Sequence, residues 1–90
     1  MPKILIPTPL RQFAGKQDSV VLAGATVAEV LQALTTQYGE LRRHLYNDEG
    51  KLRSFVNVYV NDDDVRYLSA LDTPVKDGDE VSILPAVAGG

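Results

Sequence analysis

The sequence predicts an α+β domain in which a single main helix covers one face of a mixed β-sheet. Three features predict it: a capped apolar stripe at residues 27–38, an alternating strand pattern at residues 55–60, and shorter strand-like segments near both ends of the chain. The chain has 90 residues, of which 44% are hydrophobic and 23% are charged. These fractions are typical of a globular protein, and the length suits one domain with one core.

The first elements form a predicted hairpin. Residues 3–6 are predicted as a short strand that ends at Pro7, because proline has no N–H to donate to a neighbouring strand. Residues 11–16 contain Gly15 and are predicted as a turn. The second strand is then expected at residues 17–22.

The main helix has a recognisable start and end. Thr26 and Glu29 form a capping box, in which each side chain accepts a hydrogen bond from an otherwise unpaired backbone N–H. Gly39 follows the helix and is predicted to end it as a left-handed cap. The apolar stripe recurs at spacings of three and four residues: Val27, Val30, Leu31, Leu34 and Tyr38. We therefore predict one helix over residues 27–38.

The strand at residues 55–60 has the clearest pattern in the second half of the chain. Valine at its second, fourth and sixth positions alternates with aromatic or polar residues, so that the valines face the core. Residues 40–53, which precede it, are mixed and charged, and they are predicted to contain a loop at residues 47–50.

The remaining segments are short. Residues 61–64 are predicted as a turn and residues 65–67 as a short returning strand. Residues 77–79, Asp-Gly-Asp, are predicted as another turn, which leads into a last strand at residues 80–84.

Composition excludes several classes of function. The chain has no cysteine, which excludes a disulfide framework, a thiolate nucleophile and a cysteine-based zinc site. Its net charge of −3 argues against nucleic-acid binding, which normally needs a basic excess. The longest apolar runs are only a few residues, so we expect a cytoplasmic protein with no signal peptide and no membrane contact.

No catalytic or metal-binding residue is predicted. His44 lies in a polar stretch and is expected at the surface. Residues 62–64 are three aspartates, for which a solvated turn is a better explanation than a cation site. Four arginines are more simply explained as scattered surface residues than as one basic patch: Arg42, Arg43, Arg53 and Arg66.

The C-terminal residues carry the strongest functional signal. Residues 1–85 are predicted as the domain and residues 86–90 as a flexible tail that ends in Gly89 and Gly90. Because glycine has no Cβ, such a tail can enter a channel too narrow for side chains, with Val87 and Ala88 threading behind it. The Gly90 carboxylate could then be activated as an acyl adenylate by ATP. From the glycines alone, a frayed terminus without function remains an equal alternative.

Two segments resemble the ubiquitin-like sulfur carriers, the MoaD/ThiS family. One is Asp-Gly-Asp-Glu-Val-Ser-Ile-Leu-Pro-Ala-Val-Ala-Gly-Gly at residues 77–90. The other is Phe-Val-Asn-Val-Tyr-Val-Asn-Asp-Asp-Asp-Val-Arg at residues 55–66. Combined with residues 84–90, it is most similar to the CysO-like branch that serves cysteine biosynthesis. The order of elements agrees over nearly the whole chain, and the length of residues 40–53 also favours that branch.

The resemblance implies a β-grasp fold and a reaction cycle at Gly90. An E1-like adenylating and sulfurtransferase enzyme would adenylate Gly90 with ATP and magnesium, and a sulfur donor would convert it to a thiocarboxylate. A pyridoxal-phosphate cysteine synthase would use that sulfur, and a zinc-dependent peptidase would release the product. The resemblance thus implies a carrier and cosubstrate, not an enzyme, with all cofactors bound by its partners.

The strand pattern indicates where such partners dock. If the valines of residues 55–60 lie under the helix, Phe55, Asn57 and Tyr59 face the open side of the sheet. On the last strand, Ser82 and Leu84 would lie beside them. Exposed aromatic and aliphatic residues on one face often mark a partner site, which we predict at Phe55, Tyr59 and Leu84. The alternative is that loops or residues 40–53 cover this face.

Three other functions are compatible with the sequence. A small subunit of molybdopterin synthase would deliver the same thiocarboxylate sulfur to a pterin precursor. A ubiquitin-like modifier would use the terminal glycines to form isopeptide bonds with lysines. A plain β-grasp binding module would make no use of them.

Overall fold

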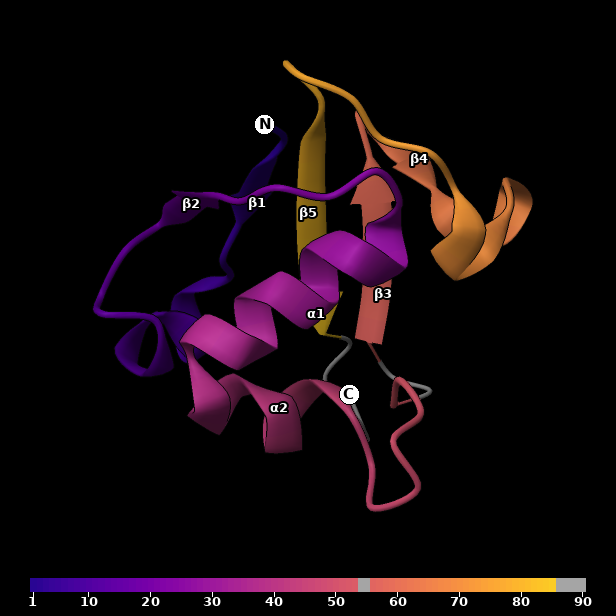
Figure 1. Ribbon diagram of the computed structural model, residues 1–90. Coiled ribbons are helices and arrows are strands. Elements are labelled where there is room, and N and C mark those ends of the chain that lie inside the picture. The colour runs from indigo at the N-terminus through magenta and orange to yellow at the C-terminus, as the bar shows by residue number, and fades with distance from the viewer. Residues whose placement is uncertain (54–55, 86–90) are drawn as a thin grey trace.

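The computed structural model describes residues 1–53 and 56–85 of the chain. Its centre is a five-stranded sheet in the order β2-β1-β5-β3-β4, and the main helix α1 (Val27–Gln37) crosses one face of that sheet (Figure 1). β1 runs parallel to β5, whereas the other neighbouring strands of the sheet are antiparallel. The prediction of a mixed sheet covered on one face by a single main helix is confirmed.

Four of the five strands lie where the sequence places a strand, with small shifts at their ends. β5 pairs with β1 on one side and β3 on the other, so the last strand is central in the sheet. The residue Phe55 of the predicted third strand lies outside the described residues. The strands are β1 (Lys3–Leu5), β2 (Ser19–Val21), β3 (Val56–Val60), β4 (Asp63–Asp64) and β5 (Glu80–Pro85).

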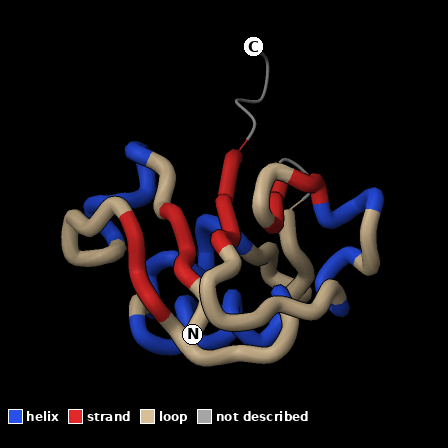
Figure 2. Tube along the Cα trace, turned by 90° about the horizontal axis from the view of Figure 1, so that it is seen from above, coloured by secondary structure: helices blue, strands red, loops and turns tan. Residues whose placement is uncertain are grey.

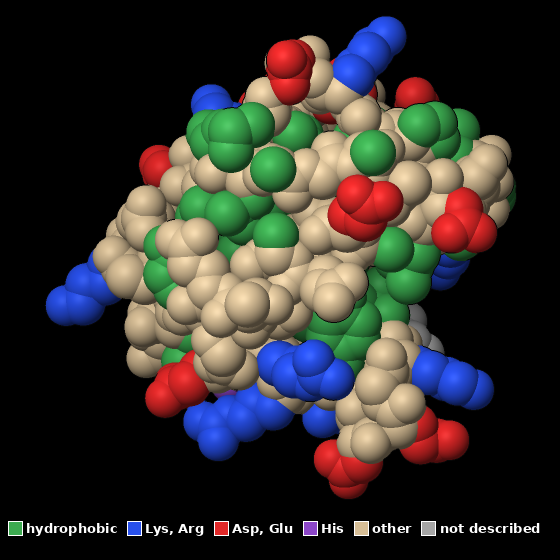
Figure 3. All heavy atoms as spheres, viewed as in Figure 1, with side chains coloured by type: hydrophobic (Ala, Val, Ile, Leu, Met, Phe, Trp, Pro, Cys, Tyr) green, Lys and Arg blue, Asp and Glu red, His purple; other side chains and the backbone are tan. Residues whose placement is uncertain are grey.

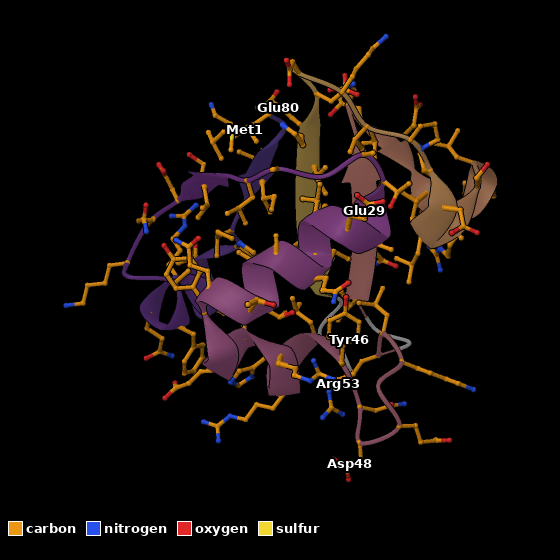
Figure 4. The ribbon with its side chains drawn as sticks, in the orientation of Figure 1. Met1, Glu29, Tyr46, Asp48, Arg53 and Glu80 are labelled. Atoms are coloured by element: carbon orange, nitrogen blue, oxygen red, sulfur yellow. The ribbon has the colours of Figure 1, made fainter. Side chains whose placement is uncertain are left out.

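The start of α1 confirms the capping box. Thr26 Oγ1 accepts a hydrogen bond from the Glu29 N–H at 3.2 Å, and Glu29 Oε1 accepts one from the Ala25 N–H at 3.2 Å. In a standard capping box, Glu29 would accept from the Thr26 N–H, so its side chain here reaches one residue further back along the chain. Figure 4 shows Glu29 at the first turn of α1. The predicted stripe is buried except at Tyr38, which is half-buried; its buried members are Val27, Val30, Leu31 and Leu34.

A second helix, α2 (Gly39–Leu45), follows α1 directly and is not predicted by the sequence pattern. The prediction of Gly39 as a left-handed cap is wrong, because Gly39 is the first residue of α2. The chain turns one residue earlier, at Tyr38, with φ −121° and ψ 82°. Leu41 and Leu45 lie one helical turn apart and are buried, which anchors α2 to the core. Figure 2 shows the helices on one side of the strand layer.

Two short segments form 3₁₀ helices instead of the predicted elements. The 3₁₀ helix η1 (Thr8–Phe13) begins before the predicted turn at residues 11–16 and includes the first part of it. The predicted strand at residues 65–67 is η2 (Val65–Tyr67), and the returning strand is β4, just before it. Asp64 Oδ1 accepts a hydrogen bond from the Arg66 N–H at 2.9 Å, which turns the backbone out of the extended conformation. A third such helix, η3 (Ala70–Asp72), follows.

The predicted turns at residues 47–50 and 77–79 are confirmed. Asn47 Oδ1 accepts hydrogen bonds from the N–H groups of Glu49 at 2.9 Å and Lys51 at 3.0 Å, which closes the first loop. Gly78 has φ 89° in the second turn, a conformation that glycine adopts without steric strain.

The core lies between the sheet and the two helices. The inward side chains of β3 and β5 alternate with outward ones, so that Val58 and Ile83 pack against α1 while their neighbours face away. The helices thus cover one face of the sheet, and the candidate site lies on the opposite face.

Candidate functional site

The face of the sheet opposite α1, which we call the open face, carries side chains from the central strands. Asn57 and Tyr59 on β3 are half-buried, as is Ser82 on β5, whereas Leu84 is 50% exposed. Asn57 lies opposite Leu84, and Tyr59 lies opposite Ser82. Paired residues share a face, so these four side chains form one surface. Tyr59 and Leu84 therefore face away from the helix as predicted, while Phe55 lies outside the described residues.

Leu5 is a member of the open face that the sequence reasoning missed. It is half-buried and lies beside Ser82 in the parallel pair of β1 and β5. The sequence shows no polar and apolar alternation here, because Ile4, Leu5 and Ile6 are all aliphatic. In the structure Ile4 and Ile6 are buried in the core, so Leu5 between them faces the other side.

Residues 40–53 pack on the other side of the sheet. Arg42 and Tyr46 line a depression together with Ala28 and Gln32 of α1. In the described part of the chain, this segment therefore covers α1 and leaves the open face to solvent, against the alternative considered from the sequence.

An exposed apolar pair extends the open face beyond Tyr59. Tyr67 is 86% exposed and Leu68 is 48% exposed. Both line a shallow depression that also includes Tyr59. The sequence reasoning missed this pair, although two adjacent large apolar residues in an otherwise polar segment were a usable signal.

An ion pair between Asp64 and Arg66 lies at the edge of the open face. Arg66 Nη2 lies 2.7 Å from Asp64 Oδ2, and the Asp64 side chain is only 8% exposed. Asp64 lies opposite Tyr59 in the sheet. The hydrogen bond from the Arg66 side chain lowers the pKa of the Asp64 carboxyl, and the Arg66 backbone N–H lowers it further.

Removal of the Asp64 carboxylate is expected to reduce the change of stability with pH in the acid range. The pKa of Asp64 in the folded state lies below its ordinary value of 3.8. The ionised group therefore stabilises the fold above about pH 4, and this contribution is lost as the pH falls through the lowered pKa. Asp64→Asn is expected to lower the melting temperature at about pH 7, with a smaller difference from the parent at about pH 2.

Thermal unfolding followed by circular dichroism measures this effect. Asp63→Asn is the matched control, because Asp63 is exposed and adjacent in β4. A deficit of Asp64→Asn that stays constant from neutral to acid pH would show that the ionised carboxylate is not what stabilises this edge.

The predicted reacting residue and its neighbours, Gly90, Gly89, Ala88 and Val87, lie outside the described residues. The structure does define the point from which they continue. β5 ends at Pro85, which lies opposite Val56 at the start of β3.

His44 is less exposed than predicted. Its ring stacks on Phe13, with ring centroids 4.3 Å apart. The side chain is half-buried, and its Nε2 atom is buried without a hydrogen-bond partner among the described residues. Phe13 comes from η1, so His44 helps to pack α2 against that segment, which the polar surroundings of His44 in the sequence did not indicate.

The explanation of four scattered arginines holds only in part. Arg66 pairs with Asp64. By contrast, Arg42 and Arg43 line one depression beside α2, and Arg53 Nε donates a hydrogen bond to the Arg43 carbonyl oxygen at 3.0 Å. These three arginines therefore lie together.

The aspartates of residues 62–64 do not form one turn. Asn61 and Asp62 form it, with φ 49° and 78°, and Asp63 and Asp64 belong to β4. Over residues 1–53 and 56–85, no group of three or more His, Cys, Asp or Glu residues could hold a metal ion. In the same residues, no helix combines the length and the hydropathy needed to cross a membrane.

The sequence and the fold of this chain both match known proteins of one family. The sequence model of the ThiS family matches residues 4–90. The sulfur carrier protein CysO of Mycobacterium tuberculosis is 47% identical over 89 residues, which cover 97% of this chain and 96% of that protein.

Two solved structures extend the comparison. A crystal structure of the BexX/CysO complex of Amycolatopsis orientalis contains a chain that superposes with a TM-score of 0.89 at 46% identity, with 100% of both chains covered. The solution structure of small archaeal modifier protein 1 of Methanosarcina acetivorans superposes with a TM-score of 0.88 at 35% identity, covering 99% of this chain and 95% of that chain. These neighbours confirm the predicted β-grasp fold.

Proposed function

The chain belongs to the ThiS family, and from this premise we propose that it is a sulfur carrier whose reacting group is the carboxylate of Gly90. One observation carries the proposal: the family match runs through residue 90, so it includes the glycines as well as the domain that presents them. The match to this chain also covers nearly the whole length of the relatives that are named as sulfur carriers. The chain then acts as a carrier and cosubstrate, and its partners provide catalysis.

The open face and the end of β5 suggest how an adenylating enzyme holds the chain. The open face presents Tyr59 and Leu84 next to the central strand that leads to the tail. Residues 86–90 can span at most about 17 Å when extended, so a domain docked through this face delivers Gly90 over a limited distance. Docking and delivery thus use the same strand.

The reaction at Gly90 has two steps. A carboxylate oxygen of Gly90 attacks the α-phosphorus of ATP, and pyrophosphate leaves to give an acyl adenylate. Sulfide then attacks the acyl carbon, and AMP leaves to give a thiocarboxylate. The carboxylate needs such activation because it is otherwise a poor acyl donor, and magnesium on the enzyme would balance the phosphate charge.

We further propose that the sulfur goes to cysteine biosynthesis. The support is the high identity to CysO sulfur carriers over nearly the full chain. In this route a pyridoxal-phosphate cysteine synthase would form a bond between the thiocarboxylate sulfur and the β-carbon of an activated serine, whose leaving group departs. The acyl group would then move from the sulfur to the amino nitrogen, and a zinc-dependent peptidase would hydrolyse the resulting amide to release cysteine and restore the Gly90 carboxylate. ATP, magnesium, pyridoxal phosphate and zinc are bound by these enzymes, and this chain binds none of them.

Reconstitution tests the proposal and separates it from the alternatives. The chain is incubated with an adenylating enzyme, ATP, magnesium and sulfide, and then with a cysteine synthase and an activated serine. In the first step the thiocarboxylate is expected to raise the intact mass by about 16 Da, because sulfur replaces one oxygen. In the second step a cysteine linked to Gly90 is expected to bring the mass to about 103 Da above that of the parent chain. A first shift without the second would favour delivery to a pterin, and a new mass equal to that of a lysine conjugate would favour a modifier.

Truncation of the open face is expected to weaken docking. Tyr59→Ala and Leu84→Ala should each weaken binding to the adenylating enzyme by more than about 1 kcal/mol, because buried aromatic and aliphatic anchors dominate such interfaces. Calorimetric titration measures the affinity. Thr36→Ala, an exposed position on α1, is the control on the opposite side. Parental affinity in both open-face variants would remove this face from the docking surface.

A further inference from the structure

The three arginines that lie together beside α2 form a surface that we call the basic end: Arg42, Arg43 and Arg53. Arg42 and Arg43 are exposed, and Arg53 is half-buried. Among the described residues, none of the three has a carboxylate within 4.0 Å, whereas Arg66 elsewhere in the chain is paired. Figure 3 shows Lys and Arg side chains gathered along the lower edge of the molecule.

Within the basic end, Arg53 is held in place by hydrogen bonds to the backbone of α2. Arg53 Nε donates to the Arg43 carbonyl oxygen at 3.0 Å, and the Arg53 N–H donates to the Leu45 carbonyl oxygen at 2.8 Å. The Arg42 guanidinium lies 6.0 Å from the centre of the Tyr46 ring. Figure 4 shows Arg53 beside the end of α2, with Asp48 further away at the tip of the loop. The Arg53 side chain is therefore positioned before a partner binds, so its ordering costs little side-chain entropy on binding.

The basic end adjoins the point where the tail leaves the domain. The Val56 N–H donates a hydrogen bond to the Arg53 carbonyl oxygen at 3.0 Å, and Val56 lies opposite Pro85 in the sheet. Arg53 is thus one hydrogen bond away from the residue that pairs with the last residue of β5. An enzyme that receives the tail must lie against this end of the domain.

Charge is distributed unevenly between the two ends of the domain. Residues 39–53, at the end where β5 finishes, include four basic and three acidic residues. Residues 61–80, which include the turns at the other end of β3 and β5, include two basic and seven acidic residues. A chain with a net charge of −3 therefore has a weakly positive tail end and a strongly negative opposite end. Such an asymmetry orients a protein as it approaches a charged partner.

We propose that the basic end docks on an acidic rim around the channel of the adenylating enzyme. This inference rests on the proposed function, and it adds a second contact to the open face. The rim carboxylates attract the tail end, repel the acidic opposite end, and so bring Gly90 toward the channel first. Charges at the rim of an interface act mainly on the rate of association and on its salt dependence.

The test is the association rate constant with the purified adenylating enzyme, measured by stopped-flow fluorescence at low and high salt. Arg42→Gln with Arg43→Gln is expected to slow association about tenfold at low salt, with the difference vanishing at high salt. The matched control, Lys16→Gln with Lys76→Gln, removes the same charge at exposed positions outside the basic end and is expected to change the rate by less than about twofold. Arg42→Lys with Arg43→Lys keeps the charge and is expected to retain most of the parental rate.

A charge change in the opposite direction keeps the test informative if the arginine variant folds poorly. Asp48→Asn with Glu49→Gln removes two exposed acidic groups from the loop beside the basic end and is expected to speed association several-fold at low salt. Equal slowing by the arginine and lysine pairs, or parental rates in both the arginine and the loop variants, would overturn the proposal. Thiocarboxylate formation by the parent chain is scored separately by mass, so failure of the proposed function is distinguishable from failure of this inference.

Discussion

Adding one residue after Gly90, or replacing Gly90 by valine, is expected to abolish adenylate formation. The extension moves the carboxylate by up to about 3.5 Å, which is far outside the tolerance of a reacting pair. Valine adds a branched side chain where the proposed channel admits only a bare backbone. In both variants, docking through the open face should remain, so the expected loss is in ATP–pyrophosphate exchange and not in binding.

The exchange assay needs a glycine control outside the tail. Gly39→Ala is suitable, because Gly39 is exposed, lies in α2, and an added Cβ would meet nothing within 4 Å. This variant is expected to exchange at the parental rate. Parental exchange by the extended chain or by Gly90→Val would show that the terminal carboxylate is not the reacting group.

Leu34→Ala is expected to have the largest effect on stability. Leu34 is fully buried at the centre of α1 and belongs to the hydrophobic cluster that joins the helices to the sheet. Loss of its burial and the cavity left behind should lower the free energy of unfolding by about 2–5 kcal/mol. For a domain of this size, that is a large part of a total of about 5–15 kcal/mol.

Urea unfolding at neutral pH measures this difference. Gln32→Ala, an exposed position in the same helix, is the control and should change stability by less than about 0.5 kcal/mol. A difference of less than about 1 kcal/mol for Leu34→Ala would mean that the helix is not packed as the structure describes.

The elements best predicted from the sequence are those in which local and tertiary signals agree. α1 combines a capping box with an apolar stripe, and both were visible in the residues themselves. The alternation in β3 likewise placed Asn57 and Tyr59 on the open face, since a strand has only two sides. The sequence pattern did not predict the pairing of β5 between β1 and β3, because strand order depends on contacts distant in sequence.

The missed elements are those in which a local signal was ambiguous. Gly39 suggested a helix end, yet the chain turns at Tyr38 and resumes as α2. The spacing of Leu41 and Leu45 was the available evidence for that helix, but a helix of seven residues has little intrinsic stability and depends on burial. The clustering of Arg42, Arg43 and Arg53 depended on this missed helix, so the sequence alone could not bring these residues together.

The intact mass of the chain after incubation with the adenylating enzyme, ATP, magnesium and sulfide tests the central claim most directly. The proposal predicts a gain of about 16 Da, the replacement of one oxygen by sulfur, located by fragmentation on the last residue, Gly90. The gain should require ATP and should be absent when the chain is extended by one residue. An unchanged mass with an enzyme that is active on its own carrier, or a gain located elsewhere in the chain, would contradict the assignment of this protein as a carrier of sulfur at its C-terminus.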